Sequence, residues 1–293
     1  MTQTFAEKSF DKIASQIAST LQLSEDMGED AQAVAFGKWM RSWASFAPQN
    51  GASNRPYNGC NSMLLGMMMG LKKWEHPFFL TFAGCKKLGG AVLKGEKSLP
   101  IFWWNMIPKK NRETGEVEGF FPQLKVFNVF NVAQTTVDPS KCQKANCEGR
   151  RIEEIDQMVK DLGVIIEGGD PAYVPSRDVV KMPEIKAFKT EADYYSSLFH
   201  ELGHWTATTE RCNRVGEKKL SYAQEELVAE MTAVFLDAEF GIEGELQHPE
   251  YIASWIKGLK NQPRQFFDAC RMAQKAANFI LQKKFEKEQK EAA

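Results

Sequence analysis

The pentapeptide from His200 to His204 reads HExxH and is the part of this chain best suited to chemistry. On an α-helix a spacing of four residues places two side chains on one face about one turn apart, so both imidazoles can bind one metal ion. Glu201 then lies where a carboxylate can take a proton from water. Two of only four histidines fall at this spacing. The pattern predicts a zinc hydrolase site, against the alternative of structural histidines that bind no metal.

A catalytic zinc ion held by two histidines needs a third protein ligand and keeps one position open. The segment that begins at Ser221 is strongly helical, and within it Glu226 and Glu230 lie one turn apart on a single face. We assign Glu226 as the third ligand and Glu230 as an outer carboxylate that orients a histidine ring. The reverse assignment, with Glu230 on the metal, stays open. Glu225 points elsewhere and is expected on a solvated helix face.

The residues before and within the motif predict the helix that must hold it. Thr190 and Asp193 supply a cap-like hydroxyl and an acidic first turn. Gly203 lowers helix propensity, and we interpret it as a small residue that lets backbone or substrate approach closely. An apolar face recurs at helical spacing, formed by Tyr194, Tyr195, Leu198, Leu202 and Trp205.

Periodicity indicates two different halves. The first half is expected to be α+β, and the second mainly helical with a small sheet. Helices are predicted over 5–21, 31–46, 61–71, 152–162, 252–260 and 263–287, and strands over 78–82, 99–104, 125–132, 163–167, 172–174 and 179–181. A polar insertion at 109–118 separates two of the strands. We place the domain boundary between Asp138 and Arg150, which gives domains of 1–140 and 150–293.

Composition is that of an ordinary globular enzyme, with 43% hydrophobic and 26% charged residues. The longest apolar runs are far too short to span a membrane. The first ten residues are polar and mixed in charge, which is not typical of a signal peptide. Six scattered cysteines form no CxxC pair. We therefore expect a cytoplasmic protein with reduced thiols and no membrane partner.

The near-neutral net charge of -1 hides a difference between the halves. Residues 1–150 contain 18 Lys plus Arg against 13 Asp plus Glu, whereas residues 151–293 contain 19 against 25. Cations and aromatic rings alternate in the first half, a combination that can hold single-stranded nucleic acid. Solvated surface lysines are the alternative, and Trp103 and Trp104 point to opposite faces of a strand, so at least one is expected in the core. The DNA-binding candidates are Arg55, Tyr57, Lys86, Lys94 and Lys97.

These residues also carry a resemblance to ArdC-type antirestriction proteins. The first half resembles the N-terminal domain of that family at RPYNGCN (55–61), LTF (80–82), LGGAVLKGEK (88–97) and VFNVFNVAQ (126–134). The second half resembles the family's zincin-type metallopeptidase domain at YY (194–195), HELGHWT (200–206) and YAQEELVAE (222–230). Cys60 and Cys212 depart from the aliphatic residues usual in the family and look like tolerated apolar replacements. The loop over 105–120 is of a kind that varies freely.

The resemblance implies a plasmid- or phage-type protein. Its N-terminal α+β domain would bind single-stranded DNA, and a mainly helical zincin-like metallopeptidase domain with a small sheet would follow. The implied function is protection of incoming DNA from host restriction, with a host restriction component as a possible protein substrate. A standalone housekeeping protease is disfavoured by the basic first half.

A hydrolytic site would have a simple division of labour. His200, His204 and Glu226 would hold Zn²⁺, for which Mn²⁺ or Ni²⁺ can substitute during purification. Glu201 would take a proton from water and pass it to the leaving amine. Tyr222 is a candidate oxyanion donor. The competing hypothesis is a metal that only stabilises the fold, with protection by DNA coating alone.

Overall fold

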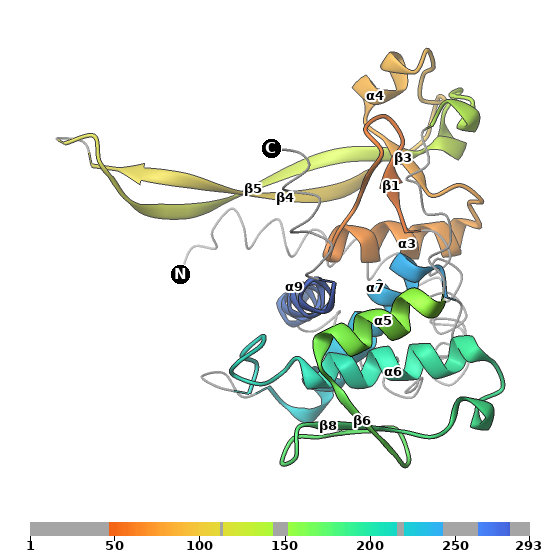
Figure 1. Cartoon of the computed structure of the whole chain (residues 1–293). Coiled ribbons are helices and arrows are strands. Elements are labelled where there is room, and N and C mark those ends of the chain that lie inside the picture. Colours follow the sequence, from red (N-terminus) through yellow and green to blue (C-terminus); the bar gives the residue numbers. More distant parts are fainter. Residues whose placement is uncertain (1–46, 112–113, 143–151, 216–219, 243–262, 282–293) are drawn as a thin grey trace.

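A twisted sheet and a group of helices form two layers in this computed structural model (Figure 1), which describes residues 47–111, 114–142, 152–215, 220–242 and 263–281. The predicted helices over 5–21, 31–46 and 252–260 lie outside these residues. Helices and strands are mixed as in the α+β class, which confirms the predicted fold class.

The upper layer is a five-stranded sheet in the order β2-β1-β3-β5-β4. Its strands are β1 (Gln49–Asn50), β2 (Arg55–Pro56), β3 (Phe78–Leu80), β4 (Leu99–Lys110) and β5 (Val117–Asn131). Neighbours pair antiparallel except β1 and β3, which are parallel.

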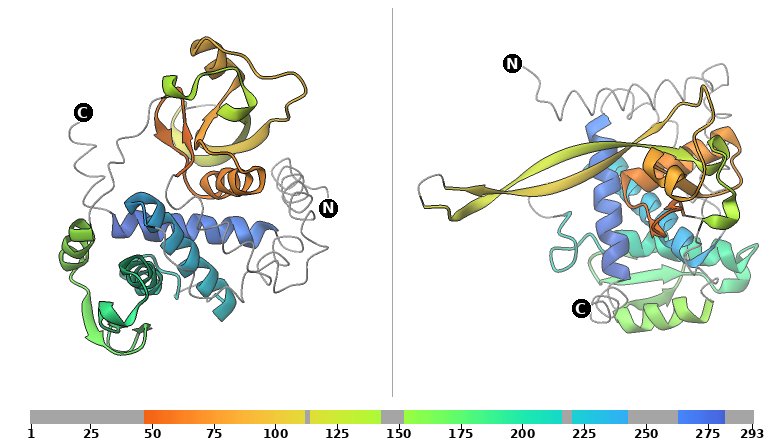
Figure 2. Two further views of the ribbon diagram at one scale, coloured as in Figure 1. Left: turned by 90° about the vertical axis from the view of Figure 1, so that its right-hand side faces the viewer. Right: turned by 90° about the horizontal axis from the view of Figure 1, so that it is seen from above.

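Strands β4 and β5 form a two-stranded ribbon that projects far beyond the rest of the sheet (Figure 2). They pair from Leu99 with Val129 to Lys110 with Val117, with a register shift after Lys109. The sequence prediction ended one strand at residue 104, began the other at 125 and treated 105–120 as a variable loop, which was wrong. The ribbon projects away from the body, so apolar and polar residues need not alternate along it to keep one face in the core.

Two helices belong to the upper layer. Helix α3 (Cys60–Lys72), predicted at 61–71, covers one face of the sheet, where its Leu65 packs in a cluster with Phe79. Helix α4 (Phe82–Lys87) was not predicted, because Phe82 was placed in the preceding strand. The Thr81 hydroxyl accepts the Gly84 N–H at 3.0 Å, an N-cap that ends the strand and begins the helix.

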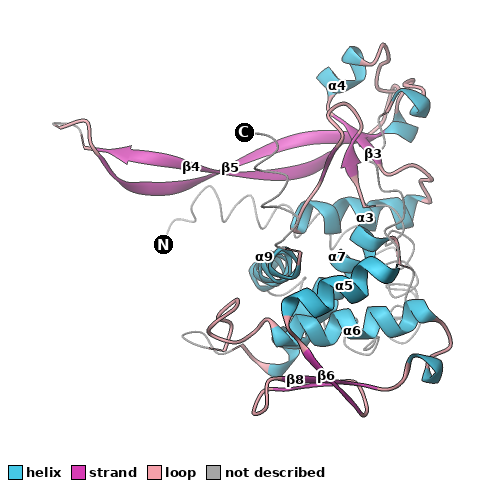
Figure 3. Cartoon of the chain, in the orientation of Figure 1, coloured by secondary structure: helices cyan, strands magenta, loops and turns pink. Residues whose placement is uncertain are grey.

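The lower layer contains the other helices and the small sheet (Figure 3), both as predicted. Its helices are α5 (Ile152–Leu162), α6 (Glu191–Trp205), α7 (Tyr222–Phe240) and α9 (Pro263–Ile280). Its strands are β6 (Ile165–Gly168), β7 (Ala172–Val174) and β8 (Val179–Met182). The order is β6-β8-β7, with β7 antiparallel at one edge and in contact with α6.

One hydrophobic core joins the layers. Met63 and Leu64 of α3 and Phe102 of β4 belong to the same buried cluster as the apolar faces of α6, α7 and α9. The Phe102 ring packs edge-on against Phe267 of α9, with centroids 6.1 Å apart. The Asn61 amide exchanges two hydrogen bonds with the Phe102 backbone, at 2.7 and 2.8 Å. The ribbon is therefore fixed to the helical layer at its base.

Within the described part of the chain, every helix falls short of the length and apolarity that a membrane crossing requires.

Candidate metal centre

The histidine motif occupies the last turns of α6, a helix whose start is well defined. The Thr190 hydroxyl accepts the Asp193 N–H at 3.1 Å and so caps the first turn. From Tyr195 to Gly203 the helix is buried. The two histidines therefore face the interior, toward α7.

Gly203 allows α6 and α7 to cross at very short range. A Cβ added at Gly203 would lie 2.9 Å from Cα and 3.2 Å from the carbonyl oxygen of Ala229. Any side chain at this position would push the two backbones apart. The close approach places Glu226, three residues before Ala229, within reach of both histidines.

The structure brings together the side chains of His200, His204 and Glu226. The two Nε2 atoms are 3.1 Å apart, and each lies 3.5 Å from a carboxylate oxygen of Glu226. One ligand atom from each residue can be chosen so that all lie within 4.8 Å of one another. Ligand atoms about 2.1 Å from a tetrahedral ion are about 3.4 Å apart, so the donor set fits a divalent metal such as zinc.

Each histidine has a carboxylate near its other ring nitrogen. His200 Nδ1 lies 3.4 Å from Glu230, the residue predicted to orient a ring. His204 Nδ1 lies 3.5 Å from Glu225. The prediction that Glu225 is solvated was wrong, because its carboxylate also accepts hydrogen bonds from the buried Arg214 at 2.6 and 2.9 Å.

Electrostatics at the cluster favour positive charge. Burial disfavours the imidazolium, but the Glu226 and Glu230 carboxylates outweigh it and raise the pKa of His200 to about 10. At His204 burial also disfavours the charged form, but the Glu225 and Glu226 carboxylates outweigh it and raise the pKa. Burial alone would raise the pKa of Glu226, but the histidines beside it lower it strongly. A cation held between these groups, either a proton or a divalent metal ion, balances the negative charge of the buried carboxylates.

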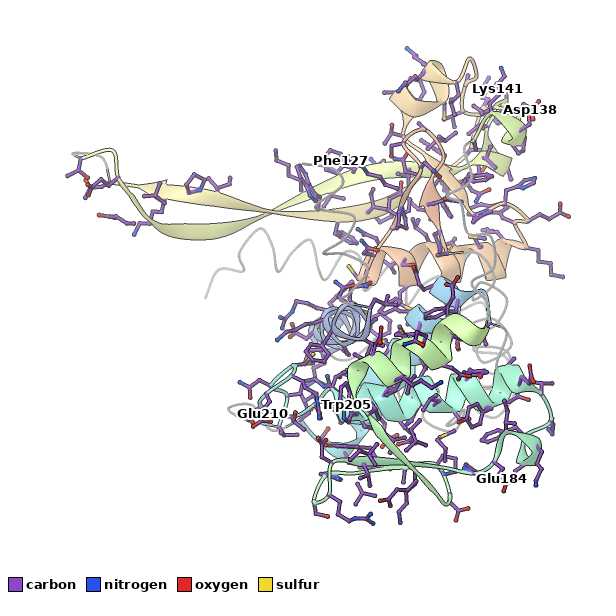
Figure 4. All side chains as sticks on the ribbon, viewed as in Figure 1. Phe127, Asp138, Lys141, Glu184, Trp205 and Glu210 are labelled. Atoms are coloured by element: carbon purple, nitrogen blue, oxygen red, sulfur yellow. The ribbon has the colours of Figure 1, made fainter. Side chains whose placement is uncertain are left out.

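Glu201 is buried and faces the edge strand β7. Its Oε2 accepts the backbone N–H of Tyr173 at 2.6 Å. The Tyr173 hydroxyl donates to Asp178 at 2.9 Å, and Arg211 donates to the same carboxylate. The guanidinium carbon of Arg211 also lies 3.7 Å from the centre of the Trp205 ring. Trp205 is the last residue of α6 (Figure 4). The proposed base is thus held by a strand that is itself tied back to the motif helix.

The sequence-predicted DNA residues lie on separate segments. Arg55, Lys86, Lys94 and Lys97 are exposed on β2, α4 and the loop that precedes β4. Tyr57 differs, since its ring packs edge-on against Phe79 and burial raises the pKa of its hydroxyl to about 12. The structure does not favour Tyr57 as an open stacking surface.

Sequence reasoning missed Glu225, Arg214 and the Tyr173 N–H. One signal for Glu225 was available: α7 contains four glutamates and an aspartate but no lysine or arginine, so its buried carboxylates need partners from other elements. Arg214 and Tyr173 carry no such signal, because their contacts depend on how a loop and a strand return to α6. Tyr222, the candidate oxyanion donor, is 69% exposed at the start of α7.

Two family models match different parts of this chain. Residues 17–130 match the model described as the N-terminal domain of anti-restriction factor ArdC. Residues 153–272 match the model described as zincin-like metallopeptidase. Residues 131–152 lie between the two matches.

Relatives of known sequence include two DNA primase TraC proteins of Escherichia coli, each 29% identical to this chain, over 290 and 275 residues. These matches take in 89% and 83% of this chain but only 27% and 18% of the respective primases, so the chain corresponds to a minor part of them. An uncharacterized protein, y4eC, of Sinorhizobium fredii (strain NBRC 101917 / NGR234) is 29% identical over 246 residues, or 80% of either chain.

Two crystal structures have a similar fold, both of the antirestriction protein ArdC from the R388 plasmid. The metal-free structure has a TM-score of 0.73 at 29% identity and covers 93% of this chain and 96% of its own. The Mn(II)-bound structure has a TM-score of 0.72 at 26% identity and covers 93% and 97%.

Proposed function

This chain is an ArdC-type protein, and from that membership we propose that it protects DNA that enters a cell on a plasmid or phage from restriction by the host. The N-terminal domain, 1–140, would bind single-stranded DNA, and the zincin-like domain, 150–293, would carry out metal-dependent peptide hydrolysis. Both would act in the cytoplasm, where incoming DNA meets restriction enzymes.

The observation that carries the proposal is the convergence of three ligand side chains beside a carboxylate. We assign His200, His204 and Glu226 as metal ligands and Zn²⁺ as the ion, with Mn²⁺ or Ni²⁺ able to replace it. Glu230 and Glu225 would hold the two rings through their Nδ1 atoms. A Mn(II)-bound structure of ArdC supports the binding of a divalent metal by a protein of this fold.

The chain's own groups supply the remaining chemistry. Bound zinc lowers the pKa of a water molecule toward about 7 and polarises a carbonyl group. Glu201 would take the proton from that water and deliver it to the leaving amine. The Tyr173 N–H holds the Glu201 carboxylate in place at 2.6 Å and so limits the orientations that it can adopt. A host restriction component is the proposed protein substrate.

The test is a transfer assay into a restricting recipient cell. Wild type and Glu210→Gln, the same chemical change at an exposed residue of the loop after α6, should protect equally. Glu201→Gln should lose protection while it keeps its metal content and melting temperature. Purified restriction subunits should be cleaved by wild type and by Glu210→Gln only. Full protection by a folded, metal-loaded Glu201→Gln protein would refute the peptidase function.

A second candidate follows from burial of the site. His200 is 1%, Glu226 4% and Glu201 6% exposed, which is typical of a structural metal. In that case the ion would only stabilise α6 against α7, and protection would come from DNA coating. The same assay separates the two functions, because coating requires no Glu201 carboxylate.

A further inference from the structure

The face of the β4–β5 ribbon opposite to Phe102 carries two exposed aromatic rings. Phe102 points inward to α9, so its neighbour Trp103 points to the opposite face. Trp103 is 53% exposed and Phe127, across the ribbon, is 41% exposed. Their ring centroids are 6.2 Å apart, with the planes tilted by 46°. Phe127 is labelled in Figure 4, where it lies on the ribbon close to the body.

A lysine completes this surface. Lys125 pairs directly with Trp103 in the antiparallel register, and its Nζ lies 5.8 Å from the centre of the Trp103 ring. The paired segments 99–103 and 125–129 contain no aspartate or glutamate. A similar pair recurs on α4, where Lys86 lies 5.2 Å from the centre of the exposed Phe82 ring. Helix α4 is on the side of the sheet away from α9 (Figure 1).

Rings with adjacent cations suit one class of occupant. Unpaired bases stack on exposed aromatic faces, and lysines between the rings neutralise the phosphates that connect the bases. Base pairing hides these faces in duplex DNA. A second copy of this chain is a poorer fit, because a two-fold contact through this face would bury Lys125 of both copies, and segments 99–103 and 125–129 offer no carboxylate to pair with it.

We propose that Trp103, Phe127 and Lys125 form the surface on which single-stranded DNA stacks. This inference rests on the proposed DNA-binding function and locates it on the ribbon, away from the residues predicted from sequence. Phe82 and Lys86 on α4 repeat the pairing of an exposed ring with a lysine.

The test uses the full chain and a fluorescein-labelled oligothymidine of about 15 nucleotides, with binding measured by anisotropy. Trp103→Ala and Phe127→Ala should each weaken binding roughly 5- to 150-fold, the loss expected for one stacked base. Trp103→Phe, which keeps a ring, should lose much less. Lys125→Gln should make the plot of log affinity against log salt concentration less steep, by roughly the contribution of one phosphate contact. Val117→Ala, a half-exposed aliphatic residue on the same strand as Phe127, is the matched control and should bind normally.

The outcomes distinguish failure of the ribbon surface from failure of the proposed DNA-binding function. If wild type does not bind oligothymidine, DNA binding and the ribbon surface both fail. If wild type binds and the Trp103→Ala, Phe127→Ala double variant binds equally well with an unchanged melting temperature, DNA binding stands and the ribbon surface is refuted. Tighter binding of oligouridine would assign the surface to RNA. A dimer that dissociates in the double variant would assign it to a second copy.

Discussion

Glu226 and Glu230 lie one turn apart on α7 and touch different sides of the histidine pair. Glu226 faces the Nε2 atoms and Glu230 faces Nδ1 of His200. We predict that Glu226→Gln lowers metal affinity by more than about 100-fold, whereas Glu230→Gln lowers it by roughly 10-fold, because an amide oxygen can still accept from Nδ1. Competition with a chelator measures both. Greater damage from Glu230→Gln would reverse the two roles.

Asp237 is a buried carboxyl group further along α7. Burial raises its pKa well above the ordinary value, a hydrogen bond from Ser196 at 2.8 Å opposes the shift, and the charge of Glu230 adds to it. The folded protein therefore keeps a proton that the unfolded chain loses above about pH 4. The free energy of unfolding should fall by about 1.4 kcal/mol per pH unit from there until the folded pKa is reached.

Asp237→Asn should remove this pH dependence, because the amide is neutral in both states and still accepts from Ser196. Urea denaturation of both proteins at pH 5 and pH 7 tests this prediction. The variant should gain stability relative to wild type as the pH rises. A difference that stays constant between the two pH values would contradict a raised pKa at Asp237.

At the level of single residues, the sequence predicted the contacts that depend on helical spacing. His200 and His204 share a face because four residues make about one turn. Glu225 was misplaced because its partners, Arg214 and the Nδ1 of His204, come from a loop and from another helix. Helical spacing locates Glu225 on α7 but does not reveal what covers that part of α7.

Among the elements, the crossing of α6 and α7 depends on Gly203. Gly203→Ala should gain about 1 kcal/mol in helix propensity. The new methyl group would nevertheless meet the Ala229 backbone at 2.9 Å, and such overpacking typically costs about 1–3 kcal/mol. We predict a lower melting temperature and weaker metal binding, since α7 carries Glu226.

Gly168→Ala is the matched control for this variant. A Cβ at Gly168, in β6, meets nothing within 4 Å. That protein should melt close to wild type and bind metal normally. If Gly203→Ala melts at or above the wild-type temperature with metal affinity intact, close packing of the two helices is not required for the site.

Helices α5 and α9 could be predicted because each buries one apolar face, which leaves a clear period in the sequence. The ribbon could not. Over 105–120 the strands pair with each other in a ribbon that projects beyond the body, and this stretch of sequence shows little alternation of apolar and polar residues. Thr81 likewise begins α4 by a side-chain cap that an apolar pattern does not reveal.

For the whole molecule, the shared core predicts that the two domains depend on each other. A fragment that ends at Cys142 would expose Met63, Leu64 and Phe102, which are buried in the full chain. Exposure of three such side chains costs roughly 5–9 kcal/mol, comparable to the entire stability of a small domain. We expect the fragment to aggregate or melt far below the full chain.

Coexpression of residues 150–293 should restore a soluble complex, because it returns the apolar partners on α9. Calorimetry of the full chain should then show one cooperative transition. A soluble fragment with the melting temperature of the full chain would show that the two domains are independent.

Phe102 and Trp103, adjacent in β4, face opposite ways: one is locked against Phe267 of α9, and the other is open to solvent. Helix α9 in turn packs against α7, which carries Glu226. A DNA strand stacked on Trp103 would therefore stand at a set distance and angle from the metal centre. Because this distance is fixed, a second protein bound to the same strand would be cleaved only if it extends far enough along the strand for one of its segments to reach His200 and His204.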